Sequence, residues 1–231
     1  MTPADACKYV AYQTYVVQGG QQLTEKISFT QKPIATAVGH RVDLRQLRDP
    51  VAANANLQAL ALEQVRYEKP LPLQALMAYP ATGAASDLTS QVDATGQLSW
   101  PAPAGTWTLY AIFQGWHGKQ VERAGPGGEG DGVDHFSKAA TEHYLRRFDQ
   151  AFKGREVKGI RAFFNDSCEV DDAQGEANWT PLLFSGFRRR RGYDLRQHLP
   201  ALFAKAEADE NQRVRTDYRE TIAELRLENY T

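Results

Sequence analysis

The pattern of hydrophobic and polar positions divides the chain into a β-rich first half and a helical second half. Residues 9–17 and 106–113 carry aromatic and β-branched side chains and are bounded by turn-forming residues, which predicts two strands. Residues 71–79 form a third short apolar run that ends at Pro80. Residues 98–100 predict a further strand, joined to 106–113 by a five-residue turn region and preceded by a turn at residues 93–96.

Past Gly118 the hydrophobic period changes from two to about 3.6, which is typical of amphipathic helices. One predicted helix begins near Asp134 or Ser137, and its apolar side chains recur every four residues, at Phe136, Ala140, Tyr144, Phe148 and Phe152. A second apolar stripe consists of Val214, Tyr218, Ile222 and Leu225. The stripe leaves an apolar face that we expect to need a partner surface.

Between these helices, residues 157–164 form an apolar run bounded by polar segments, which predicts a buried strand. A strand with a helix on either side implies a parallel sheet or barrel, in which loops at the carboxyl ends of strands build the active site. Asp166 and Glu169 follow this run directly. They are candidate catalytic acids, and an acidic, solvated loop is an equally good interpretation.

Composition and charge narrow the possible functions. Hydrophobic residues make up 42% of the 231 positions and charged residues 24%, as in ordinary soluble globular proteins. The net charge of −1 gives no reason to expect nucleic acid as a partner. The basic run at residues 188–191 is typical of the last turn of a helix closed by Gly192, more than of a phosphate site.

Several segment types are not predicted. No run approaches 18 apolar residues, so no membrane span is expected, and the N-terminus lacks a basic-then-apolar signal peptide. Cys7 and Cys168 lie far apart and form no metal-binding motif. The Gly-rich loop at residues 125–130 lacks the spacing of both phosphate-binding motifs, and either a carbohydrate-contacting loop or a flexible connector explains it.

Three stretches resemble glycoside hydrolase family 106, which comprises large bacterial α-L-rhamnosidases and related glycosidases. They are residues 165–170 (Asn-Asp-Ser-Cys-Glu-Val), 177–181 (Ala-Asn-Trp-Thr-Pro) and 187–195 (Phe-Arg-Arg-Arg-Arg-Gly-Tyr-Asp-Leu). Less specific similarity extends over nearly the whole chain. It includes residues 3–10, which resemble the entry to the family's β-rich insertion, and residues 125–137, which resemble its return into the barrel.

The resemblance implies an α+β, multidomain architecture. Residues 1–117 would form a β-sandwich-like, insertion-like module, and residues 118–231 part of a (β/α)8 barrel of the TIM type. About 250 residues usually build such a barrel, so we expect a fragment that self-associates through exposed strand edges and helix faces. Relatives of this family are often periplasmic or secreted, and the localisation of this chain stays open.

The resemblance also implies an inverting, calcium-dependent hydrolysis of terminal sugars. We predict Glu169 as the general acid, because apolar neighbours would raise its pKa. The predicted substrate-binding residues are Asp134, Asn165, Asp166 and Trp179. Glu129 and Asp134 are available as the second carboxylate, although the family pattern puts it on a later strand. We assign no residues to calcium, although residues 171, 172 and 176 offer a few oxygens. The family's usual aromatic before this Glu is replaced by Cys168.

Three functions compete at this point. The leading one is a piece of a glycoside hydrolase that acts on oligo- or polysaccharide and is inactive alone. The alternative is a non-catalytic carbohydrate-binding or remnant protein. A third is an assembly protein whose apolar helix faces pair with a second polypeptide.

Overall fold

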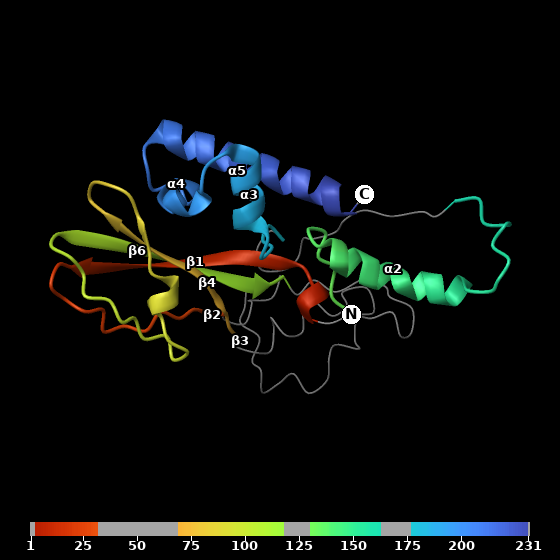
Figure 1. The fold of residues 1–231 in the computed structure, drawn as a ribbon, viewed down its shortest axis with the longest axis horizontal. Helices are drawn as coiled ribbons and strands as arrows, with labels where there is room; N and C mark the ends of the chain where they lie inside the picture. Colours follow the sequence, from red (N-terminus) through yellow and green to blue (C-terminus); the bar gives the residue numbers. More distant parts are fainter. Residues whose placement is uncertain (1–2, 32–68, 118–129, 163–176, 231) are drawn as a thin grey trace, which may run out of the picture.

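The structure is a computed structural model that describes residues 3–31, 69–117, 130–162 and 177–230 (Figure 1). The strands are β1 (Lys8–Gln18), β2 (Thr30–Gln31), β3 (Lys69–Pro70), β4 (Leu73–Pro80), β5 (Ser86–Asp87) and β6 (Thr106–Trp116). The α-helices are α2 (Lys138–Phe152), α3 (Leu183–Arg191), α4 (Leu199–Leu202) and α5 (Ala208–Tyr230). Short 3-10 helices are η1 (Pro3–Asp5), η2 (Thr89–Gln91) and η3 (Leu195–Gln197).

The centre of the fold is a four-stranded antiparallel sheet with the order β1-β6-β4-β5. β1 pairs with β6 along its whole length, from Lys8 opposite Trp116 to Gln18 opposite Thr106. The three strands expected at residues 9–17, 71–79 and 106–113 are thereby confirmed. The strand expected at residues 98–100 is wrong, because within it only Leu98 forms an isolated bridge, to Val92. That bridge closes the predicted turn, in which the Gly96 N–H donates to the Asp93 carbonyl at 2.9 Å.

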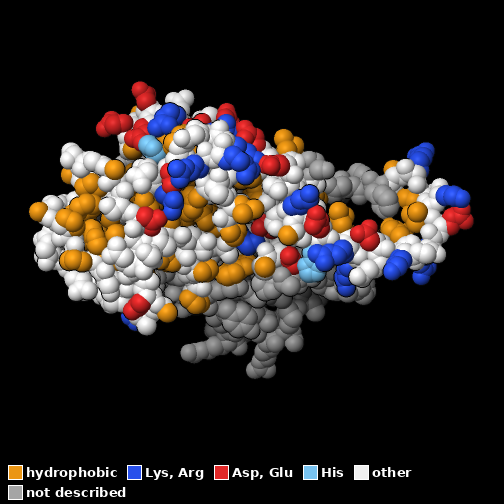
Figure 2. Space-filling model, viewed as in Figure 1, with side chains coloured by type: hydrophobic (Ala, Val, Ile, Leu, Met, Phe, Trp, Pro, Cys, Tyr) orange, Lys and Arg blue, Asp and Glu red, His pale blue; other side chains and the backbone are white. Residues whose placement is uncertain are grey.

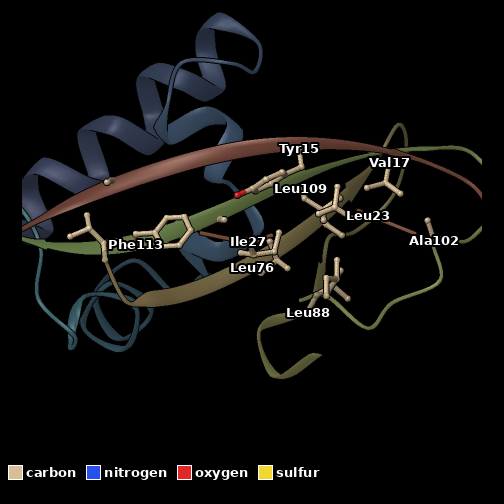
Figure 3. Close-up of a cluster of buried hydrophobic side chains, with 14 of the residues drawn as sticks. Tyr15, Val17, Leu23, Ile27, Leu76, Leu88, Ala102, Leu109 and Phe113 are labelled. Atoms are coloured by element: carbon tan, nitrogen blue, oxygen red, sulfur yellow. The ribbon is translucent and has the colours of Figure 1, made fainter. Parts of the chain in front are cut away.

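One face of the sheet is covered by loops rather than by a second sheet. Successive side chains of a strand point to opposite faces, so Tyr15, Leu76 and Leu109 share one side. Leu23 and Leu88, from the connecting loops, pack onto them (Figure 3). Burying this apolar surface at about 25 cal/mol per Å² is the main stabilising contribution on that side. Among the described residues the only strands in this layer are the two-residue pair β2–β3, so a β-sandwich is not found there.

The other face is covered by helices α3, α4 and α5 (Figure 1). Met77 and Ile112 of the sheet pack in one cluster with Val214, Ile222 and Leu225 of α5. This corrects the expectation that the α5 stripe would need an outside partner, because its four side chains are at most 9% exposed. The expectation failed because the sheet has a second apolar face, which the stripe covers.

Helix α2 forms where the sequence predicts it. The Ser137 hydroxyl accepts a hydrogen bond from the Ala140 N–H at 3.2 Å and caps the helix. The apolar stripe is only partly buried, however: Ala140 is enclosed, while Tyr144 and Phe148 are 42% and 41% exposed. Figure 1 shows α2 extending away from the sheet, which leaves that end of the stripe uncovered.

The predicted parallel barrel is not found among the described residues, where every strand pair is antiparallel. Residues 157–162 are irregular, and Val157 and Ile160 are 42% and 41% exposed. The prediction of a buried strand is therefore wrong for these residues, and residues 163–164 lie outside the described part. Lys158, Gly159 and Arg161 interrupt the apolar run, and no described strand lies beside it to pair with it.

The architecture of the described residues is thus an antiparallel sheet with helices on one face. The apolar cluster on that face contains residues from both sides of the predicted boundary at 117/118, while residues 118–129 themselves lie outside the described part. The division into two domains stays a prediction. None of the described helices is both long and apolar enough to span a membrane.

Candidate functional site

The predicted site residues fall into two groups. Glu169, Asn165 and Asp166 lie outside the residues that the structure describes, as does Cys168. Asp134 and Trp179 are described, and the segment that follows the candidate acid is described from Ala177 onward. The structure therefore shows what surrounds the candidate acid segment along the chain, and the role of Glu169 stays a prediction.

The start of β1 brings Asp134 and Trp179 together. The Lys8 carbonyl accepts a hydrogen bond from the Trp179 N–H at 3.3 Å, and the two residues form an antiparallel bridge. The Lys8 ammonium lies 2.7 Å from the Asp134 carboxylate. Lys8 thus joins two segments that lie on either side of the candidate acid in the sequence.

Both oxygens of the Asp134 carboxylate have partners inside the protein. One oxygen pairs with Lys8, the other accepts from the Phe136 N–H at 3.0 Å, and the side chain is 1% exposed. Lys8 is 4% exposed and also donates to the Ala4 and Ala6 carbonyls, each at 2.8 Å. Buried charges persist where pairing and hydrogen bonds replace water, as they do here. This geometry gives Asp134 a structural role. Its contact with substrate stays a prediction, which the burial of both carboxylate oxygens does not support.

Trp179 is a core residue in the same way. It is 2% exposed, its indole N–H donates to the Gln114 side-chain oxygen at 3.3 Å, and Phe184 packs edge-on with ring centroids 5.1 Å apart. An aromatic side chain stacks on a sugar through an accessible ring face. The buried ring of Trp179 offers none, so its predicted sugar contact gains no support from the structure.

The residues that follow the candidate acid are fixed to two elements. The Asn178 side-chain oxygen accepts a hydrogen bond from the Val10 N–H of β1 at 3.2 Å. The Asn178 backbone carbonyl accepts one from the Tyr218 hydroxyl of α5 at 2.7 Å. The Ala177 carbonyl accepts from the Arg226 guanidinium at 3.1 Å. Ala177 has a φ of 46°, an uncommon value for a residue other than glycine. The chain therefore leaves the candidate acid segment at a firmly held position.

Sequence reasoning missed Lys8 and Arg226 as parts of this arrangement. A lysine at the start of a strand and an arginine on an amphipathic helix are usually exposed, so composition alone gave no signal. Tyr218 did have a sequence signal, because its place in the apolar stripe predicts that its side chain faces inward.

A small cluster of titratable groups lies beside Asp134. The Cys7 thiol donates to the Val133 carbonyl at 2.8 Å and lies 3.9 Å from Nδ1 of His135. Burial, and then the positive charge of Arg226, lower the pKa of His135. The Tyr230 ring meets the His135 ring edge-on at 4.5 Å. The lowered pKa favours the neutral imidazole, which suits a packed position.

Comparison with known proteins identifies the family. The family model of glycoside hydrolase family 106, described as α-L-rhamnosidase, matches residues 74–231. The chain belongs to this family. Its match includes the motif stretches at residues 165–170, 177–181 and 187–195.

A solved structure has the same fold. The rhamnosidase from Novosphingobium sp. PP1Y superimposes with a TM-score of 0.63 at 18% sequence identity, over 99% of this chain and 35% of that chain. This chain thus spans about a third of the length of that enzyme. A search of curated proteins found no match.

Proposed function

We propose that this chain forms part of the catalytic unit of a glycoside hydrolase that resembles inverting α-L-rhamnosidases. The substrate would be a terminal sugar on an oligo- or polysaccharide. The observation that carries the proposal is the family match over residues 74–231, because this stretch contains the carboxylate motif around Glu169.

In this proposal Glu169 is the general acid that protonates the leaving glycosidic oxygen. An inverting enzyme needs a second carboxylate roughly 6.5–9.5 Å away, to activate a water on the opposite face of the sugar. Asp134 is poorly suited to that role because it is buried against Lys8. The second carboxylate would then come from Glu129 or from family sequence that this chain does not contain.

Anchoring of the adjacent backbone supports the proposal. Catalytic groups work when rigid elements hold them within a fraction of an ångström. The chain after the candidate acid is tied to β1 through Asn178 and to α5 through Tyr218 and Arg226. These bonds hold one end of the acid segment against the sheet.

Calcium belongs to the proposal only through the family resemblance. Calcium binds six to eight oxygen ligands. Among the described residues no group of three or more Asp, Glu, His or Cys side chains is placed to hold a metal, and Asp134 and Asp5 are paired with Lys8 and His143. The described residues therefore do not fit a calcium site.

The test is Glu169→Gln in this chain extended to the full family length. The substitution keeps the side-chain shape and removes the acid, and general acid catalysis is worth roughly 10²–10⁴-fold. We expect a loss of that size on a natural glycoside and a smaller loss on an aryl glycoside with a good leaving group. Glu156→Gln is the matched control, because Glu156 is 73% exposed and its pair is with the exposed Lys158. Equal rates for wild type and Glu169→Gln on both substrates would exclude Glu169 as the acid.

A further inference from the structure

The two edges of the central sheet are protected very differently. The β5 edge is two residues long, and its Asp87 pairs with Arg196 at 2.8 Å. The β1 edge is eleven residues long and carries no charged side chain from Tyr9 to Gln18. Edge strands are usually protected against pairing by being short or by carrying charged side chains. A long, uncharged edge strand can pair with another strand.

Among the residues that the structure describes, the outer backbone groups of β1 have partners only near its start. The Lys8 carbonyl is taken by Trp179 and the Val10 N–H by Asn178. In an antiparallel strand alternate residues direct their N–H and C=O groups to the same edge, so Tyr12, Thr14 and Val16 follow in this series. Within the described part of the chain no hydrogen bond reaches the outer groups of these three residues.

The free stretch is also accessible. Val16 is 63% exposed and Thr14 is exposed, whereas Tyr12 lies half-buried against Phe203, with ring centroids 3.6 Å apart. Figure 2 shows mostly hydrophobic and uncharged side chains at the left end of the molecule, where β1 ends. A strand added here would meet little charge and would not have to displace a folded segment from Thr14 or Val16.

We propose that the β1 edge binds the β1 edge of a second copy of this chain, in an antiparallel, two-fold symmetric pair. The free stretch from Tyr12 to Val16 has Thr14 at its centre, so a two-fold axis there places Thr14 opposite Thr14 and Tyr12 opposite Val16. Thr–Thr and aromatic–β-branched pairs are favourable across antiparallel strands. Because the stretch is uncharged, the two copies do not repel each other, and their sheets join into one. This inference is independent of the proposed catalytic function.

Sedimentation velocity on the 231-residue chain tests the proposal. We expect the mass to rise with concentration from 25.8 kDa toward twice that value. Val16→Lys should return the chain to a monomer, because the two-fold pair would then carry two lysines, each opposite a Tyr12 of the other copy, in a contact that is otherwise uncharged. Leu227→Lys is the matched control: Leu227 is 65% exposed on α5, and its replacement should leave the dimer intact.

Cysteine cross-linking gives a second readout that does not depend on the lysine variant. In a Cys168→Ser background, Thr14→Cys should form a disulfide-linked dimer under mild oxidation, while Thr216→Cys, at an exposed position of α5, should not. The proposal is overturned if the wild-type chain stays monomeric at all concentrations. A monomeric chain whose β1 edge binds an added extended peptide would also overturn it. It is equally overturned if Val16→Lys leaves the dimer unchanged, or if Leu227→Lys dissolves it as well.

Discussion

At the scale of single residues, Lys8 and Asp134 form the most informative contact. Their charged atoms lie 2.7 Å apart, and neither side chain is more than 4% exposed. Through this pair the first strand holds the segment that leads into α2, and through its backbone Lys8 holds Trp179. Asp134, predicted from the sequence to bind substrate, is thus paired with Lys8, a partner that the sequence did not suggest.

Replacing Asp134 by Asn should destabilise the protein by about 3–5 kcal/mol, because the Lys8 ammonium would stay buried without its counter-charge. Denaturant unfolding of the 231-residue chain measures this. Glu142→Gln is the control, since Glu142 is 58% exposed and its pair with Lys138 at 3.9 Å contributes little. If Asp134 served sugar binding alone, both variants would unfold at the wild-type denaturant concentration.

Tyr9 should make stability fall at high pH. Burial raises the pKa of Tyr9 from 10.0 to about 12, and its hydroxyl donates to Gln31 at 3.0 Å. The folded state keeps this proton between about pH 10 and 12, whereas the unfolded state loses it. Stability from Tyr9 is therefore complete below pH 10 and declines by about 1.4 kcal/mol per pH unit as the pH rises through this window.

Unfolding free energies measured across that window check the expectation. Tyr9→Phe should show a shallower decline, because one proton fewer distinguishes the two states. A wild-type stability that stays constant from pH 10 to 12 would contradict it. The pKa of Tyr79 is also raised by burial, so some decline should persist in the variant.

At the scale of elements, the contact between α3 and α5 explains the basic run. The Arg190 and Arg191 guanidiniums pair with Glu224, Arg191 also pairs with Glu220, and Arg190 also with Glu228. Figure 2 shows basic and acidic side chains intermingled over these helices. Gly192 closes α3 in the left-handed conformation, with a φ of 78°. The basic run thus joins α3 to α5 through Arg190 and Arg191. This agrees with the sequence-based interpretation, which favoured the last turn of a helix over a phosphate site.

Arg191→Gln should lower stability by about 1–3 kcal/mol. Arg191 is 15% exposed, and besides its two carboxylate partners it donates to the Thr221 hydroxyl at 3.1 Å, so its loss removes several charge-assisted bonds. Arg219→Gln, at an exposed position of the same pair of helices, should change stability by less than about 0.5 kcal/mol. Thermal unfolding of both variants at low and high salt checks this, and equal effects would contradict the assigned role of the α3–α5 contact.

At the scale of the whole molecule, the sheet and its helices form one packed unit, while α2 extends from it with exposed aromatic side chains. The family match covers residues 74–231, and the chain spans 35% of the Novosphingobium rhamnosidase. A reaction that needs two carboxylates is complete in such a part only if both lie within it, and the buried Asp134 is not an open candidate.

We therefore expect the 231-residue chain alone to fold but to show little or no turnover on an aryl α-L-rhamnoside, with or without added calcium. The same assay on the chain extended to family length is the positive control. Robust turnover by the shorter chain would contradict the expectation, and would direct the search for the second carboxylate to Glu129 and its neighbours.

The sequence by itself determined the elements whose signals are local. The alternation in β1 and β6, the cap at Ser137 and the glycine stop at Gly192 each depend on a few neighbouring residues, and each was found where it was predicted. The family also followed from the sequence, because its motifs are contiguous.

Only the tertiary structure decided what those elements pack against. The α5 stripe covers the second face of the sheet, the run at residues 157–162 lies exposed without a neighbouring strand, and Lys8 pairs with an aspartate 126 positions away. Gly115 is a further case, since a Cβ there would lie 2.1 Å from the Tyr9 ring. Such contacts join residues that are distant in the chain, and their free energy depends on which surfaces meet, so no local pattern encodes them.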